Sequence, residues 1–198
     1  MSDACRYRAY LIIGAPGSGK GTQGRALGTV PRFFHCACGD VFRSLELRTP
    51  LGQKFLEYSS RGELVPDDLT VQLWKVRIDA NVETHAFKPD LDALVLDGIP
   101  RNVAQAKLME SMVDVRRVFH LSCPNRAELV NRIRKRALKD NRYDDASEQV
   151  IQRRIRTYEE ETHPVLEFYG PDKVVDIDAT QPPVAVLGRI IQSILEEA

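Results

Sequence analysis

A glycine-rich segment with one lysine follows a short apolar run near the start of the chain. The run is Tyr10–Ile13, and the segment reads Gly14-Ala15-Pro16-Gly17-Ser18-Gly19-Lys20-Gly21-Thr22-Gln23. Because glycines lack Cβ atoms, successive backbone N–H groups can converge on phosphate oxygens, and the N-terminus of a following helix favours negative charge. A buried strand that leads into such a loop is typical of a P-loop, in which Lys20 would contact nucleotide phosphates. A glycine-rich turn with a surface lysine explains the spacing less well.

The residue after the lysine narrows the class of P-loop protein. That position usually holds Ser or Thr, whose hydroxyl binds Mg²⁺. Here it is Gly21, and Thr22 comes one residue later. Switch GTPases and motor ATPases normally need the hydroxyl at position 21, so the sequence argues against both classes.

The composition predicts a single domain whose overall charge does not attract nucleic acid or an anionic membrane. The chain has 198 residues, of which 43% are hydrophobic, and 28 Lys+Arg balance 28 Asp+Glu. Such a balance offers no overall basic field for nucleic acid or an anionic membrane. No apolar run approaches the roughly 20 residues of a membrane span, and no signal sequence is apparent. We therefore expect a soluble cytoplasmic monomer. Its four cysteines, Cys5, Cys36, Cys38 and Cys123, are expected to be buried thiols rather than disulfides or zinc ligands.

Apolar segments and helical patterns alternate along the chain. Parallel strands are predicted at 7–13, 33–37, 93–97, 117–121 and 173–178. Helical spacing relates Leu129, Val130, Ile133 and Ala137, and later Leu187, Ile190, Ile191, Ile194 and Leu195. This alternation predicts an α/β fold with a doubly wound, five-stranded parallel sheet and a ligand at the carboxyl ends of its strands.

Two segments interrupt the alternation. Residues 38–80 carry helical patterns without a strand, which predicts an insertion after the second strand. Residues 136–146 are polar and lack an apolar face, which predicts a mobile loop between two helices. The core of the single domain would then comprise 1–37, 81–135 and 147–198.

Several motifs resemble those of adenylate kinases and other nucleoside monophosphate kinases. The loop GAPGSGKGTQ resembles the loop of that family, which also lacks a hydroxyl directly after its lysine. LDGIPR at 96–101 resembles LDGFPR, GDVFR at 39–43 resembles GD(M/L)LR, and GELVPD at 62–67 resembles GxLVPD. The arginines at 132, 136, 142 and 154 resemble a spaced RxxxR…RxDD…R pattern. The resemblance runs from about residue 8 to 195, with a short lid that lacks a zinc-bearing insertion.

The resemblance implies a P-loop NTPase fold and reversible phosphoryl transfer from Mg-ATP to AMP, giving two ADP. It implies that ATP is bound by Gly17, Ser18, Gly19, Lys20, Gly21, Thr22, Arg132, Arg136 and Gln181. It implies that AMP is bound by Cys38, Gly39, Arg43, Glu63, Leu64, Val65, Gly98, Arg101, Gln105, Arg142 and Arg154. The catalytic residues would be Lys20, Arg101, Arg132, Arg142 and Arg154. Asp97 would hold Mg²⁺ through water, and no structural zinc is expected.

Some alternatives stay open at the level of sequence. Gln105 stands where adenylate kinases carry the glutamine that reads adenine, but Cys38 replaces their usual threonine near the acceptor base, so a UMP/CMP-type kinase is the second interpretation. Arg153 competes with Arg154 for the position on the helix after the lid. A catalytically silent nucleotide-binding protein would be expected to lack Lys20 or a site arginine, and none is missing. Arg126 is expected to lie on a solvated face.

Overall fold

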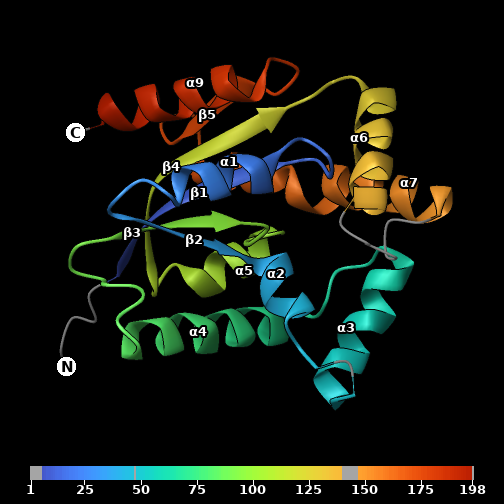
Figure 1. Cartoon of the computed structure of the whole chain (residues 1–198), viewed down its shortest axis with the longest axis horizontal. Coiled ribbons are helices and arrows are strands. Elements are labelled where there is room, and N and C mark those ends of the chain that lie inside the picture. Colours follow the sequence, from blue (N-terminus) through green and yellow to red (C-terminus); the bar gives the residue numbers. More distant parts are fainter. Residues whose placement is uncertain (1–5, 47, 140–146, 198) are drawn as a thin grey trace.

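Five parallel strands form one sheet in the order β2-β3-β1-β4-β5, which confirms the predicted α/β architecture (Figure 1). The strands are β1 (Tyr7–Gly14), β2 (Phe33–Ala37), β3 (Ala93–Asp97), β4 (Val113–Ser122) and β5 (Val174–Asp178). This is a computed structural model, and it describes residues 6–46, 48–139 and 147–197. The order of the strands reverses at β1, so the P-loop that follows β1 lies at the switch point where such sheets bind ligands.

Helices separate the strands and cover both faces of the sheet. They are α1 (Lys20–Leu27), α2 (Cys38–Arg43), α3 (Pro50–Arg61), α4 (Asp67–Glu83), α5 (Val103–Met109), α6 (Arg126–Lys139), α7 (Glu148–Thr157), α8 (Pro164–Tyr169) and α9 (Pro183–Leu195). A π-helical turn, Tyr158–Thr162, joins α7 to α8. In Figure 1, α1 and α9 lie on one side of the sheet, while α4 and α5 lie on the other.

Alternating side chains of the strands divide the core into two layers. Leu11 of β1 lies in one buried cluster with Trp74 and Ile78 of α4. Its neighbour Ile12 lies in a second cluster with Ile190 of α9. Because successive side chains of a strand point to opposite faces, a strand buried on both faces must be apolar throughout. This is why the short apolar runs of the sequence identified the strands.

Two predicted elements differ in extent or orientation from the structure. β4 begins at Val113 rather than at 117, because buried Val113 and Val115 alternate with the charged side chains of Asp114 and Arg116. Helix α9 buries Val186, Ile190 and Ser193. The helix that helical spacing predicted is present, but two of the residues at that spacing, Ile191 and Leu195, are 37% and 71% exposed. Apolar residues occur on more than one face of α9, so spacing alone did not fix which face meets the sheet.

Helices α2, α3 and α4 occupy the segment between β2 and β3, where an insertion was predicted. Helix α3 projects away from the sheet in Figure 1, whereas Trp74 and Ile78 of α4 belong to the main core. Of the predicted lid, 140–146 lie outside the described residues, so the division into core, insertion and lid stays a prediction. None of the helices in the described ranges combines the length and apolar character needed to cross a bilayer.

Helix α1 lies so close to β2 that the ring of His35 fits against Gly24 only because glycine has no side chain. A Cβ atom at Gly24 would lie 2.4 Å from Nε2 of His35. Alanine normally stabilises a helix by about 1 kcal/mol relative to glycine, but overpacking a filled site costs about 1–3 kcal/mol. We therefore expect Gly24→Ala to lower the free energy of unfolding by up to about 2 kcal/mol, measured by denaturant titration.

Gly188 of α9 provides the matched control for this prediction. A Cβ atom there would meet nothing within 4 Å, so Gly188→Ala should stabilise the protein by up to about 1 kcal/mol. In a His35→Ala background, Gly24→Ala should no longer destabilise. Equal losses from Gly24→Ala in both backgrounds would contradict the proposed contact.

Candidate functional site

One cavity of about 630 Å³ opens at the carboxyl ends of the strands. It extends from the P-loop across the ends of β1, β2 and β3 to α2, α6 and α7, and it reaches the segment after β5. Its lining includes every predicted site residue that the structure describes. Arg142 lies outside the described residues. The motifs, which are far apart in the sequence, therefore meet at one site.

The P-loop surrounds the side chain of Lys20. Gly17 and Gly19 adopt φ values of 85° and 100°, in a region of backbone conformation that residues with a Cβ atom rarely adopt. Lys20 Nζ donates hydrogen bonds to the carbonyl oxygens of Gly14, at 2.8 Å, and Ala15, at 3.1 Å. Burial lowers the pKa of Lys20 to about 8, an effect that Asp97 partly opposes. An anion that entered the loop would stabilise the charged ammonium.

Asp97 lies beside the first turn of α1, at the end of β3. Its Oδ2 atom is 3.4 Å from the position that a Cβ atom of Gly21 would occupy. Within the described ranges, no group of three or more His, Cys, Asp or Glu could hold a metal ion. Mg²⁺ usually binds one or two carboxylates together with water and substrate phosphates, so a single carboxylate next to a phosphate loop fits it.

Two arginines, Arg43 and Arg101, line the cavity. Arg101 Nε donates to the carbonyl oxygen of Gly98 at 2.9 Å. Arg43 Nη2 lies 2.6 Å from Asp40 Oδ1, which holds the guanidinium over the first turn of α2. The hydroxyl of Thr162 donates to the carbonyl oxygen of Arg101 at 2.7 Å and so ties the arginine segment to the π-helical turn. Planar guanidinium groups are suited to binding a phosphate through paired hydrogen bonds.

Two buried side chains line the end of the cavity near Gln105, namely the thiol of Cys38 and the amide of Gln105 itself. Cys38 is 2% exposed, and burial raises the pKa of its thiol to about 11. Gln105 is 1% exposed. Its Oε1 atom accepts the backbone N–H of Arg101, and its Nε2 atom donates to Asp67, both at 2.8 Å. An amide held in this way can present both a donor and an acceptor to a ligand.

Two adjacent arginines of α7 have different surroundings. Arg154 lines the cavity. Arg153 instead lies 3.3 Å from Glu63 through its Nη2 atom, and its side chain is 55% exposed. Glu63 also accepts a hydrogen bond from Arg61 Nε at 3.0 Å. This placement favours Arg154 over Arg153 as the residue that would meet a ligand.

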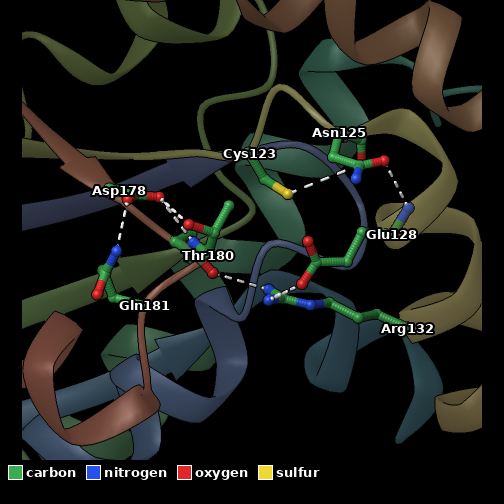
Figure 2. A network of polar contacts seen from close by, with 8 residues as sticks. Cys123, Asn125, Glu128, Arg132, Asp178, Thr180 and Gln181 are labelled. Carbon is green, nitrogen blue, oxygen red and sulfur yellow. Dashed lines mark hydrogen bonds and ion pairs between the residues drawn. The ribbon is translucent and has the colours of Figure 1, made fainter.

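The opposite end of the cavity is joined to β5 by Arg132. Arg132 Nη1 donates to the carbonyl oxygen of Ala179 at 2.9 Å, and its Nη2 atom is paired with Glu128 (Figure 2). The two contacts connect α6 to the segment after β5. A guanidinium has five N–H donors, so they leave donors of Arg132 for a ligand.

The segment after β5 is stabilised by Asp178. Figure 2 shows Thr180 and Gln181 turned toward Asp178. Thr180 donates its backbone N–H at 2.9 Å and its hydroxyl at 2.6 Å, and Gln181 Nε2 donates at 3.0 Å. These hydrogen bonds lower the pKa of Asp178. Gln181 therefore reaches the cavity edge from an ordered turn.

The structure adds residues that the sequence did not single out. Phe42 and Phe55 line the cavity with stacked rings whose centroids are 5.1 Å apart. They lie on different helices, α2 and α3, so no spacing rule connects them. The prediction that the cysteines are buried holds for Cys36 and Cys38, whereas Cys123 is only partly buried because it lies at the exposed start of the turn after β4. All three are free thiols, and Cys5 lies outside the described residues.

Comparisons with known proteins agree on one family. The family model described as adenylate kinase matches residues 12–174. An adenylate kinase of Cyanothece sp. is 36% identical over 187 residues, which cover 91% of each chain. An adenylate kinase of Thermobifida fusca is 33% identical and covers 95% of this chain and 98% of its own. One from Chlamydia muridarum is 31% identical over 94% of this chain and 87% of its own.

Proposed function

This chain belongs to the adenylate kinase family and is a phosphotransferase acting between ATP and AMP, and we propose that the residues lining its cavity bind both nucleotides at once. The observation that carries this proposal is the continuity of the cavity. It joins the P-loop lysine to the arginines of three separate segments, Arg43, Arg101 and Arg154. One end would hold the donor near Gln181, and the other would hold the acceptor near Gln105.

We assign the phosphates to the middle of the cavity. Lys20 would contact the β and γ phosphates of ATP, while Arg43 and Arg101 orient the phosphate of AMP. Arg154 would help to orient that phosphate, and Arg136 would bind ATP. Arg132 and Arg142 would act with Lys20 to stabilise the transferred group. Because the phosphoryl group in flight spreads negative charge over three oxygens, positioned cations supply most of the stabilisation. The attacking phosphate oxygen is already an anion, so no side chain needs to act as a general base.

Asp97 is the residue that we propose for Mg²⁺, through bound water. A bound Mg²⁺ would supply positive charge that offsets the negative charge of the ATP phosphates. The carboxylate of Asp97, which lies beside Gly21, would orient the hydrated ion. Residues 38–80 and 136–146 are proposed to close over the nucleotides, which would exclude water as a competing nucleophile.

We also propose that the enzyme acts as a cytoplasmic monomer whose ligands are ATP, AMP and ADP. The described residues of one chain contribute groups to both ends of the cavity and to its phosphate-binding middle, so no second copy has to complete the site. Sedimentation of the purified protein would test this.

AMP is expected to be the preferred acceptor, although Cys38 could weaken its binding. Losing a neutral hydrogen bond costs about 0.5–1.5 kcal/mol, whereas a matched polar edge can discriminate by about 10⁴-fold. With ATP as donor, kcat/KM should therefore be highest for AMP among AMP, CMP, UMP and GMP. Cys38→Thr should lower the KM for AMP.

Two outcomes would contradict this assignment. A higher kcat/KM for CMP or UMP than for AMP would favour a UMP/CMP-type kinase and remove the role assigned to Gln105. Tight nucleotide binding without ADP formation in a coupled assay would favour a silent nucleotide-binding protein.

A further inference from the structure

The amide of Gln105 is fixed in one orientation by two groups of opposite character. The backbone N–H of Arg101 donates to Oε1 at 2.8 Å. The Oδ1 atom of Asp67 accepts from Nε2, also at 2.8 Å. A backbone N–H can only donate, and a carboxylate can only accept. If the amide were rotated by 180°, it would place a donor against a donor and an acceptor against an acceptor.

Asp67 acts on the cavity without lining it. It is the first residue of α4, and its side chain is partly exposed. The described residues that line the cavity include Gln105 but not Asp67. The same Oδ1 atom also accepts from Asn102 Nδ2 at 2.8 Å. Asn102 in turn accepts the backbone N–H of Gln105 at 2.8 Å, so the carboxylate and the amide belong to one network.

The orientation of this amide decides which purine it can bind. Adenine presents an amino donor next to a ring-nitrogen acceptor on its Watson–Crick edge, whereas a 6-oxopurine presents an acceptor next to a ring N–H donor. An amide that bonds both atoms of one edge must rotate by 180° to bond the other. A locked amide therefore rejects the wrong edge, because rotation leaves buried polar groups unpaired.

We propose that Asp67 is a positioning residue that selects 6-aminopurine over 6-oxopurine acceptors by locking the Gln105 amide. The proposal rests on the proposed function, which places the acceptor base beside Gln105. Asp67 supplies one of the two contacts that oppose rotation, and Arg101 supplies the other. Removing the carboxylate leaves the Arg101 contact in place, so discrimination falls without being abolished.

The test compares AMP with IMP, whose purine carries oxygen at position 6 and lacks the 2-amino group of GMP. The measured quantity is the ratio of kcat/KM for AMP to kcat/KM for IMP, with ATP as donor. Asp67→Ala should lower this ratio about tenfold, the effect of losing one hydrogen bond to a charged group. Asp67→Asn loses the charge but keeps an acceptor oxygen, which the Nδ2 donor of Asn102 would hold toward the amide, so it should lower the ratio less than Asp67→Ala does.

Asp68→Ala is the matched control. Asp68 is also acidic and in the first turn of α4, but it is exposed, and the described residues that line the cavity do not include it. It should leave the ratio unchanged. A merely structural effect of Asp67→Ala would lower activity with AMP and IMP together, at an unchanged ratio, and would overturn the proposal.

Gln105→Ala separates this proposal from the proposed function. If Gln105→Ala does not change the ratio, Gln105 does not read the base, and both assignments fail. If Gln105→Ala lowers the ratio but Asp67→Ala does not, only the role of Asp67 fails. In a Gln105→Ala background, Asp67→Ala should have no further effect on the ratio, and a further drop would overturn the proposal.

Discussion

Replacing Arg101 by alanine is expected to lower kcat with ATP and AMP by about 10²–10³-fold, the typical cost of removing a charge contact from a transition state. Arg101 lines the cavity, and the hydrogen bond from its Nε atom to Gly98 at 2.9 Å holds the guanidinium in place. Its proposed partner is the phosphate of AMP. Steady-state rates at saturating concentrations of both nucleotides measure this effect.

Arg126 and a lysine substitution provide the controls for Arg101. The side chain of Arg126 is 48% exposed, and its guanidinium lies 3.4 Å from Glu159 on the surface. Because exposed ion pairs contribute little, Arg126→Ala should leave kcat nearly unchanged. Arg101→Lys keeps the charge but loses the planar pair of donors, so it should restore only part of the activity. An unchanged rate in Arg101→Ala would refute the assignment of Arg101 to the acceptor phosphate.

Much of the fold was predictable because its sheet is buried on both faces. Val95 and Leu96 are both completely buried, so β3 had to be an apolar run that spacing could reveal. The start of β4 was missed because Asp114 and Arg116 alternate with buried valines there. Spacing predicted helix α9 but not which of its apolar residues are buried, since Ile191 is 37% exposed. In both elements, packing against neighbouring elements determines which residues are buried, and local spacing does not reveal this.

The candidate site was predictable to the extent that its residues form short motifs. Lys20, Asp97 and Arg101 each stand in a segment whose spelling indicates a phosphate site, and all three line one cavity. A motif identifies which residues line the site, but it does not show which other residues they contact. The hydrogen bond from Arg132 to the carbonyl oxygen of Ala179, for example, joins residues 47 positions apart and connects α6 to the segment after β5.

The Asp67 network could not be predicted for a related reason. Asp67 bonds Gln105 across 38 positions, and the described lining of the cavity does not include it. In the sequence, Asp67 is one of two adjacent acidic residues at the start of a helix, which is where acidic residues are favoured in any case. Only the packing of α4 against α5 separates its role from that of Asp68.

Binding of ATP is expected to weaken as the pH rises above 8, because Lys20 loses its proton in the empty site. Burial lowers the pKa of Lys20 to about 8, and the phosphates of ATP would raise it again in the complex. Binding therefore takes up a proton at high pH, and the Kd for ATP should rise about tenfold per pH unit above 8. Calorimetric titration from pH 7 to 9.5 with excess Mg²⁺ measures this slope. The terminal phosphate has a pKa of about 6 and is fully ionised in this range.

Substitutions of Lys20 identify the group that titrates. Cys38 and Tyr158 also line the cavity, but burial raises their pKa values to about 11 and about 12, above the window. Lys20→Met should lower kcat/KM about 10²–10³-fold and abolish the slope. Lys20→Arg replaces the ammonium with a guanidinium that stays charged throughout the range. The Kd of this variant for ATP should therefore be independent of pH, whatever its affinity. A slope that persists in Lys20→Arg would place the titrating group elsewhere. A flat profile in the unaltered protein would mean that Lys20 stays charged in the empty loop, because the carbonyl oxygens of Gly14 and Ala15 then compensate for its burial.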